Sequence, residues 1–174
     1  MEAYYLEITK IGFYLYIFLL VMAAAFDAWK FIIPNVLSVA LIGLFLVVAT
    51  ASPFPVKWWS HVGAAVVFFA VGLVLYRFKI LGAGDIKLIT SVALWAGFEH
   101  LPVLILGVAL AGGALSLFLI ILRRVVISVL VYLKSSENTT LPRILLVGEA
   151  VPYGVGIAAG SIWLSFSLPL LGGL

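Results

Sequence analysis

Long apolar stretches alternate with short polar ones along the whole chain of 174 residues. Most of the apolar stretches are close to the roughly 20 residues that a helix needs to cross the hydrocarbon core of a bilayer. The pattern therefore predicts an all-α membrane protein with about six transmembrane helices. The expected spans are Ile11–Phe26, Pro34–Ala51, Val62–Tyr76, Ile86–Phe98, Leu101–Leu122 and Val151–Leu171.

Composition points to the same class of protein. The chain is 66% hydrophobic and 10% charged, whereas a soluble domain carries about 25% charged residues. Little is left for a water-soluble domain, so we expect one membrane domain over residues 1–174, without a separate soluble domain. The absence of cysteine excludes disulfides, a cysteine nucleophile and Cys-ligated metal centres. With two histidines in the chain, we expect no metal site and no cofactor.

Two segments near the ends of the predicted helices need interpretation. Met1–Ala25 resembles a secretory signal, but Glu2 and Glu7 give its start the wrong charge for a signal peptide. We therefore expect the first helix to be retained. Val125–Leu133 is apolar but too short to span, and it is interpreted as a continuation of the fifth helix or as a helix on the membrane surface. Residues 125–150 stay open between a surface helix and an ordered loop.

Lysine and arginine are distributed unevenly between the two sides of the predicted bundle. One side carries Lys10 and Lys57, and the other carries Lys30, Arg77, Lys79, Lys87, Arg123, Arg124, Lys134 and Arg143. Because cytoplasmic loops are enriched in these residues, both termini are predicted to face away from the cytoplasm. The asymmetry also explains the net charge of +3 by orientation and lipid contact, so no nucleic acid is expected as a partner.

Two of the seven acidic residues stand at the predicted membrane boundary. Asp27 follows the apolar run that ends at Phe26, and Asp85 precedes the run that begins at Ile86. Carboxylates at such depth are costly and usually have a function. Both lie on the predicted cytoplasmic side, where two close carboxyl groups would share one proton near neutral pH. Such a pair fits aspartic-protease chemistry. The alternative is that these side chains cap helix ends or neutralise Lys30 and Lys87.

The residues around the two acids favour a functional site. Gly82 and Gly84 flank Ala83 directly before Asp85, and glycines allow positive φ and the close approach of an extended peptide. Asp85 is expected to open a helix, where free amides favour its charged form. Pro34 and Asn35 are expected to start the second span, with Asn35 hydrogen-bonded to local backbone.

At these residues the sequence resembles the prepilin peptidases, which are GxGD-type intramembrane aspartic proteases of bacteria. Three motifs carry the resemblance. They are Asp27 followed seven positions later by Pro34-Asn35, then Gly82-Ala83-Gly84-Asp85-Ile86-Lys87-Leu88, and then Val151-Pro152-Tyr153-Gly154. They extend from the first predicted span to the last, in the order typical of the family.

The resemblance implies that Asp27 and Asp85 are the catalytic pair. It places substrate or loop contacts at Gly82, Gly84, Lys87, Pro34, Asn35, Pro152, Tyr153 and Gly154. It further implies that the chain removes short basic leaders from type IV prepilins and pseudopilins at the cytoplasmic face of the bacterial inner membrane. The lack of paired cysteines and the short length resemble the minimal branch that serves Flp-type pili, so methyl transfer is expected to be absent. Pilus assembly machinery is a further expected partner.

Other functions and other roles for single residues stay open at this stage. The family also includes archaeal preflagellin peptidases, and two unrelated classes are a proton- or cation-coupled transporter and a non-enzymatic assembly scaffold.

Lys87 lies two residues beyond Asp85, so on a helix it is expected to point away from that acid. The Gly156/Gly160 pair of the last span, like Ala109/Gly113 of the fifth, indicates close helix packing. Glu99 is expected in an outer turn with His100 and Pro102.

Overall fold

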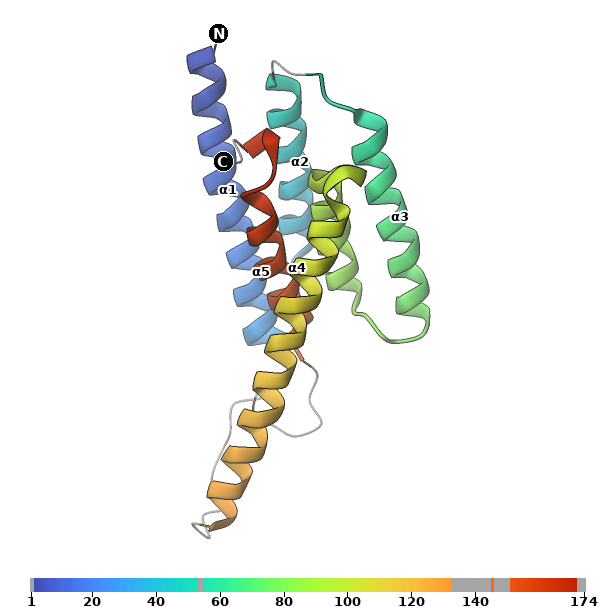
Figure 1. Ribbon diagram of the computed structural model, residues 1–174. Helices are drawn as coiled ribbons and strands as arrows, with labels where there is room; N and C mark the ends of the chain where they lie inside the picture. Colours follow the sequence, from blue (N-terminus) through green and yellow to red (C-terminus); the bar gives the residue numbers. More distant parts are fainter. Residues whose placement is uncertain (1, 53–54, 133–144, 146–150, 172–174) are drawn as a thin grey trace.

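The structure is a computed structural model that describes residues 2–52, 55–132, 145 and 151–171. Its helices are α1 (Glu2–Lys30), α2 (Asn35–Ala51), α3 (Trp58–Arg77), α4 (Ala83–Tyr132) and α5 (Tyr153–Ser165), followed by the short 3₁₀ helix η2 (Pro169–Leu171). The described residues contain no strand. The helices form an elongated bundle (Figure 1), which confirms the prediction of an all-α membrane protein.

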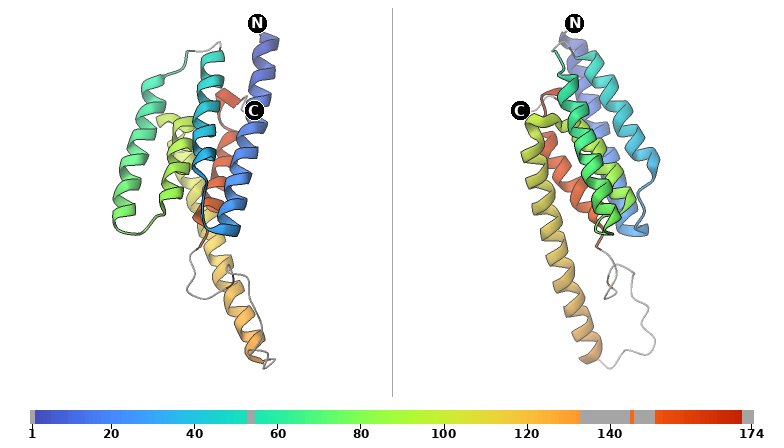
Figure 2. Two further views of the ribbon diagram at one scale, coloured as in Figure 1. Left: turned by 180° about the vertical axis from the view of Figure 1, so that it is seen from behind. Right: turned by 90° about the vertical axis from the view of Figure 1, so that its right-hand side faces the viewer.

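Helix α4 is two helices joined by a sharp reversal. Gly97 interrupts its helical geometry with φ 58° and ψ 177°, a backbone conformation that is essentially restricted to glycine. Figures 1 and 2 show the first arm of α4 running back along α3 and the second arm returning along the bundle. The two arms correspond to the predicted fourth and fifth spans. The predicted turn around Glu99, His100 and Pro102 is displaced by a few residues, because Pro102 lies inside the helix.

Polar side chains satisfy the backbone groups that the reversal leaves free. Phe98 N–H donates to Ser60 Oγ at 2.9 Å, and the ring nitrogen Nδ1 of His61 lies 2.8 Å from the Leu94 carbonyl oxygen. His100 Nδ1 lies 3.3 Å from the Ala96 carbonyl oxygen. Helix ends buried in an apolar setting need such partners. Both histidines of the chain therefore stabilise the turn between the arms of α4.

The core lies between α1, α2, α4 and α5, and its centre is aromatic. Tyr16 and Trp95 are fully buried, with ring centroids 5.0 Å apart, and Phe45 packs on Trp95 at 5.4 Å. The Trp95 indole N–H donates to the Leu41 carbonyl oxygen at 3.0 Å. Helix α3 lies at the side of the bundle and packs mainly against α4 (Figure 2). Trp95 is thus a packing residue at the centre of the core.

Small residues let α5 approach the second arm of α4. A Cβ added at Gly156 would lie 2.7 Å from Gly112 Cα, and one added at Gly160 would collide with backbone atoms of Gly107 and Val108. The prediction of close packing at Gly156 and Gly160 is confirmed. The prediction for Gly113 is wrong, because a Cβ there would meet nothing within 4 Å; its neighbour Gly112 makes the contact.

Helix lengths differ from the predicted spans in three places. Helix α1 begins at Glu2 instead of Ile11, because its polar first turns stay helical, and the predicted last span is reduced to the 13 residues of α5 followed by η2.

By length and composition, 3 segments could cross a membrane, namely Glu7–Lys30, Trp58–Arg77 and Ala83–Leu130, and α2 and α5 are shorter apolar helices. The second arm of α4 runs on to Tyr132, so up to that residue Val125–Leu133 continues the fifth helix. Residues 133–144 and 146–150, which include Lys134, Arg143 and Glu149, lie outside the described residues.

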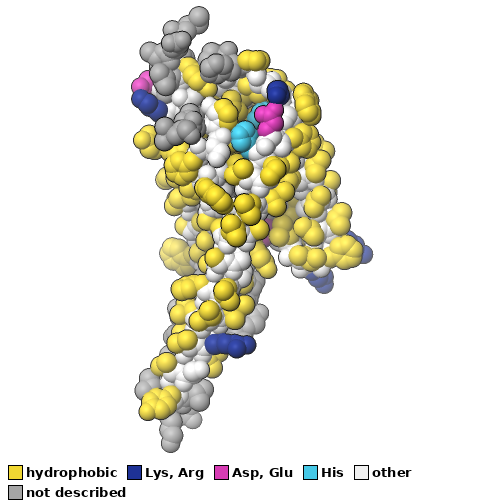
Figure 3. Space-filling view, viewed as in Figure 1, with side chains coloured by type: hydrophobic (Ala, Val, Ile, Leu, Met, Phe, Trp, Pro, Cys, Tyr) yellow, Lys and Arg dark blue, Asp and Glu magenta, His cyan; other side chains and the backbone are white. Residues whose placement is uncertain are grey.

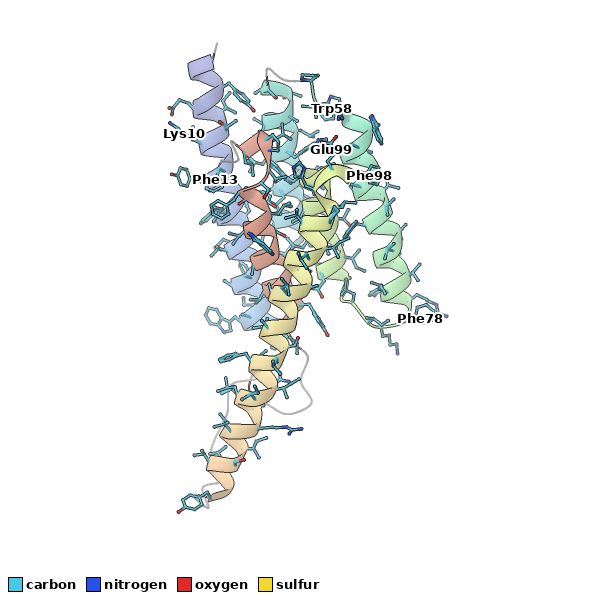
Figure 4. All side chains as sticks on the ribbon, viewed as in Figure 1. Lys10, Phe13, Trp58, Phe78, Phe98 and Glu99 are labelled. Carbon is cyan, nitrogen blue, oxygen red and sulfur yellow. The ribbon has the colours of Figure 1, made fainter. Side chains whose placement is uncertain are left out.

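The two ends of the bundle carry different polar groups. The start of α1 and η2 lie at the same end (Figure 1), together with Lys10 and Glu99, whereas Phe78 lies at the other (Figure 4). At the first end, Lys57 Nζ lies 2.6 Å from Glu99 Oε1. Figure 3 shows basic, acidic and histidine side chains gathered there on a face that is otherwise largely hydrophobic. That end also holds a cavity of about 180 Å³, lined by His61, His100, Lys57 and Glu99 among others.

Candidate active site

Asp27 and Asp85 meet at the end of the bundle opposite the start of α1. Asp27 lies in the last turn of α1 and Asp85 in the first turn of α4, so 57 residues of chain separate two side chains that line the same cavities. Both are buried, with relative exposures of 6% and 9%. They are close enough for the charge of Asp27 to act on Asp85. The structure thus brings the two acids that the sequence singles out to the same cavities.

Two adjoining cavities give access to the carboxyl groups. One of about 700 Å³ is lined by the end of α3, the loop after it and the start of α5, including Tyr76, Arg77, Lys79 and Tyr153. The other, about 290 Å³, is lined by the linker from α1 to α2 and the start of α4, including Asn35, Gly82 and Lys87. The pair therefore lies between two spaces large enough for a peptide segment and water.

Asp27 caps the N-terminus of α5. Gly154 N–H donates to Asp27 Oδ2 at 2.7 Å, and Val155 N–H also donates to this carboxylate. The first N–H groups of a helix lack partners within the helix and carry its positive dipole end, so a carboxylate is stabilised there. Pro152 and Tyr153 precede Gly154 and set the start of this helix. Asp27 therefore does cap a helix end, as one of the alternatives from the sequence proposed.

Asp85 is held by the glycine-rich turn that precedes it. Gly82 N–H donates to Asp85 Oδ2 at 3.2 Å, and a Cβ added at Gly82 would lie 2.9 Å from the same oxygen. Asp85 opens its helix as predicted, since α4 begins two residues earlier. Gly82 is exposed at the cavity, which agrees with a glycine that leaves room beside the carboxylate.

The side chain of Ile33 packs between Gly84 at the start of α4 and Gly154 at the start of α5. A Cβ added at Gly84 would lie 3.2 Å from Ile33 Cβ, and one added at Gly154 would lie 2.7 Å from Ile33 Cδ1 and 2.8 Å from Asp27 Oδ2. Gly84, predicted with Gly82 to lie along an extended substrate, packs against Ile33 and also lines the smaller cavity. Sequence reasoning missed Ile33. Its signal was an apolar run, Phe31–Ile33, in a linker expected to be polar.

Pro34, Asn35 and Lys87 form the edge of the smaller cavity. Pro34 precedes α2 with φ −61°, as expected for a residue at a helix start. Asn35 was predicted to bond local backbone, which is wrong, because its Oδ1 accepts a hydrogen bond from Lys87 Nζ at 2.8 Å. Lys87 therefore points to α2 and not to Asp85, as the helical spacing predicted. Lys30 lies over the Phe26 ring at 5.7 Å.

Comparison with known proteins agrees with this geometry. The model of the type IV leader peptidase family matches residues 13–117, which contain Asp27, Asp85 and the residues around them. The chain belongs to the type IV leader peptidase family. Gly154 lies outside the matched residues, although the structure places it against Asp27.

Part of the chain is also similar to a named bacterial protein. A prepilin leader peptidase/N-methyltransferase from Dickeya chrysanthemi is 31% identical over 98 residues, which are 53% of this chain and 35% of the relative. The matched part of the chain thus spans about a third of the length of that relative. No solved structure matches the chain. Within the described part of the chain, no group of three or more His, Cys, Asp or Glu side chains is arranged to hold a metal ion.

Proposed function

We propose that this protein is an aspartic endopeptidase that removes the leader peptide from prepilins. Family membership supports peptidase activity, and the name of the Dickeya relative supports the substrate class. The observation that carries the proposal is the convergence of two buried carboxyl groups, distant from one another within the matched region, on shared cavities at one end of the bundle.

The proposed reaction uses Asp27 and Asp85 as a pair with one shared proton. The charged carboxylate removes a proton from water, whose oxygen adds to the carbon of the scissile amide. The protonated carboxyl gives its proton to the carbonyl oxygen, as in aspartic proteases. When this intermediate collapses, the amine leaves with the proton that water gave, and one hydroxyl of the former carbonyl carbon returns a proton to the carboxylate that had supplied one. The leader then ends in a carboxyl group, the mature protein begins with an amine, and the Asp pair again holds one proton.

The site favours a substrate that is extended where it is cut. A helical segment keeps its amides in internal hydrogen bonds, so the scissile bond must leave the helix before water can attack it. The exposed Gly82 and the 700 Å³ cavity beside it supply space for such a segment. We propose that the cut segment lies along Gly82, one of the two glycines at which the sequence predicts it, and along Tyr76 and Tyr153.

The isosteric variants Asp27→Asn and Asp85→Asn test the proposal most simply. In a reconstituted assay with a prepilin substrate, each is expected to lose cleavage by about 10³-fold or more, because each removes one of the two proton-transfer groups. Glu99→Gln, which removes an exposed acid at the other end of the bundle, is the matched control and should cleave at the parent rate. Cleavage at the parent rate by either Asp variant would refute the proposal.

The finer parts of the function are proposals of the same kind. We place the protein in the bacterial inner membrane with Asp27 and Asp85 facing the cytoplasm, which the distribution of lysine and arginine supports. We propose Flp-type prepilins and pseudopilins as substrates and pilus assembly machinery as a partner. Parallel assays on a Flp-type prepilin, a longer type IV prepilin and a preflagellin would rank these substrates. The same reactions with S-adenosylmethionine would show whether the mature N-terminus is methylated, which we do not expect.

A further inference from the structure

We propose that Asn35 is a positioning residue that holds the Lys87 ammonium away from Asp27 and Asp85, so that this pair can keep its shared proton. The inference rests on the proposed function. It assigns to Asn35 and Lys87 a role other than substrate contact.

The observation is a cation inside the cavity of the acid pair that does not bind either acid. Lys87 lines the 290 Å³ cavity together with Asp27, Asp85 and Asn35. Its Nζ instead donates to Asn35 Oδ1 at 2.8 Å. The ion pairs of the described residues join Lys10 to Glu7 and Lys57 to Glu99, and neither involves Lys87. Asn35 thus provides the acceptor that Lys87 uses.

The location of Asn35 fits this task. It is the first residue of α2 and follows Pro34, whose fixed φ sets the direction of the helix start. Its amide oxygen is neutral, so it can accept from Lys87 without adding a third negative charge beside the carboxyl groups. The Lys87 side chain is exposed and has a flexible four-carbon stem, so its position depends on the acceptor that it finds.

The chemical consequence concerns the proton of the pair. A cation close to two carboxyl groups stabilises their charged forms. If both are charged, no proton is available for the carbonyl oxygen of the substrate, and one half of the acid–base mechanism is lost. Release of Lys87 toward the pair should therefore slow cleavage at neutral pH and move the active pH range to lower values.

Other charged groups near the pair are present in every variant of the test. Arg77 and Lys79, from the end of α3 and the loop after it, line the larger cavity together with the phenols of Tyr76 and Tyr153, and Lys30 follows Asp27 in the last turn of α1. Helix α2 contributes Asn35 at this end. Because these groups do not change, a difference between the variants reports the location of the Lys87 charge.

Three variants separate the proposed role from a simple tether between α2 and α4. Asn35→Ala removes the acceptor and keeps the cation, so cleavage at pH 7 is expected to fall about 10- to 100-fold, with the pH profile moved about one unit toward acid. Lys87→Met removes the cation and should cost less. The double variant Asn35→Ala/Lys87→Met should recover the rate and the pH profile of Lys87→Met.

The outcomes decide between the two roles. If Asn35→Ala, Lys87→Met and the double variant are equally slow, the hydrogen bond acts as a tether and the proposal is wrong. It is equally wrong if Asn35→Ala cleaves like the parent. Asn35→Asp retains an oxygen acceptor for Lys87 and should cleave faster than Asn35→Ala, which excludes misfolding as the cause of the loss. Failure of the proposed function itself would appear separately, as cleavage by Asp27→Asn or Asp85→Asn.

Discussion

At the scale of single residues, two glycines of the motifs are required by the carboxylates beside them. A Cβ at Gly154 would meet Asp27 Oδ2 at 2.8 Å and Ile33 Cδ1 at 2.7 Å, and a Cβ at Gly82 would meet Asp85 Oδ2 at 2.9 Å. The sequence could predict that both acids lie at a membrane boundary, since each adjoins an apolar run. It could not predict Ile33 or the bond between Asn35 and Lys87, because these depend on the approach of segments that are distant in the chain.

Gly154→Ala tests the contact that holds Asp27. The new methyl group would press on Asp27 Oδ2 and Ile33 Cδ1, and a displacement of about 1 Å in a catalytic group can cost about 100-fold in rate. We expect cleavage to fall by this order in the reconstituted assay, with substrate binding less affected. Gly113→Ala, which adds the same group in open space, should cleave at the parent rate. Equal rates for the two variants would contradict the assigned role of Gly154.

At the scale of elements, the reversal in α4 and the contact of α5 with α4 organise the bundle. The pattern of apolar residues predicted two spans on either side of residue 99, and the structure has two arms there. The pattern predicted the turn at the wrong position. The polar residues Glu99 and His100 indicated a turn there, whereas the backbone turns at Gly97. A hydropathy pattern does not report a positive φ, although glycine at the end of a span is a weak signal.

Gly97→Ala should weaken the reversal. The backbone conformation at this position is strained for any residue with a Cβ, at a cost of about 1–3 kcal/mol. The methyl group would also lie 3.1 Å from Ser60 Oγ, which accepts from Phe98 N–H. We expect a lower free energy of unfolding for the purified protein in mixed micelles. Gly43→Ala, a helix glycine with open space around it, should be neutral or more stable, and an unchanged stability of Gly97→Ala would show that the turn lies elsewhere.

Gly160→Ala tests the contact between α5 and the second arm of α4. Its Cβ would overlap backbone atoms of Gly107 and Val108, so the helices must separate. Overpacking of this kind costs about 1–3 kcal/mol. Because α5 also carries Gly154, we expect both the free energy of unfolding and the cleavage rate to fall. A change at Gly160 that alters neither quantity would contradict the close contact.

At the scale of the whole molecule, one end of the bundle carries the acid pair and the other carries the chain start, η2 and the Lys57–Glu99 ion pair. The number and order of the apolar helices were largely predictable when the two arms of α4 are counted separately, because each helix comes from its own apolar stretch. The early end of α5 was not predictable. The residues that follow it, up to and including η2, are as apolar as the helix itself. The sequence could predict that Asp27 and Asp85 lie on the same side of the bundle. It could not predict that both are buried, because their burial depends on how the helices pack and not on the hydrophobic pattern.

The orientation of the bundle can be measured with single cysteines, because the natural chain has none. We predict that a membrane-impermeant maleimide added outside spheroplasts labels Lys57→Cys, and that it labels Lys79→Cys after the membrane is opened. The physical reason is the excess of lysine and arginine on the Lys79 side, which is retained in the cytoplasm. The reverse labelling pattern would place the acid pair on the outer side and contradict the proposed site of leader cleavage.

The central proposal is that Asp27 and Asp85, which line the same cavities, lie close enough for one water molecule to bridge their carboxyl groups. The double variant Asp27→Cys/Asp85→Cys tests it directly, in native membranes and without an added substrate. We predict that a short thiol-specific cross-linker joins the two positions, detected as a linked peptide by mass spectrometry, while Asp27→Cys/Lys57→Cys gives no such product. If Asp27→Cys/Asp85→Cys yields no cross-link although both thiols react singly, the two carboxyl groups do not form a pair and the account fails.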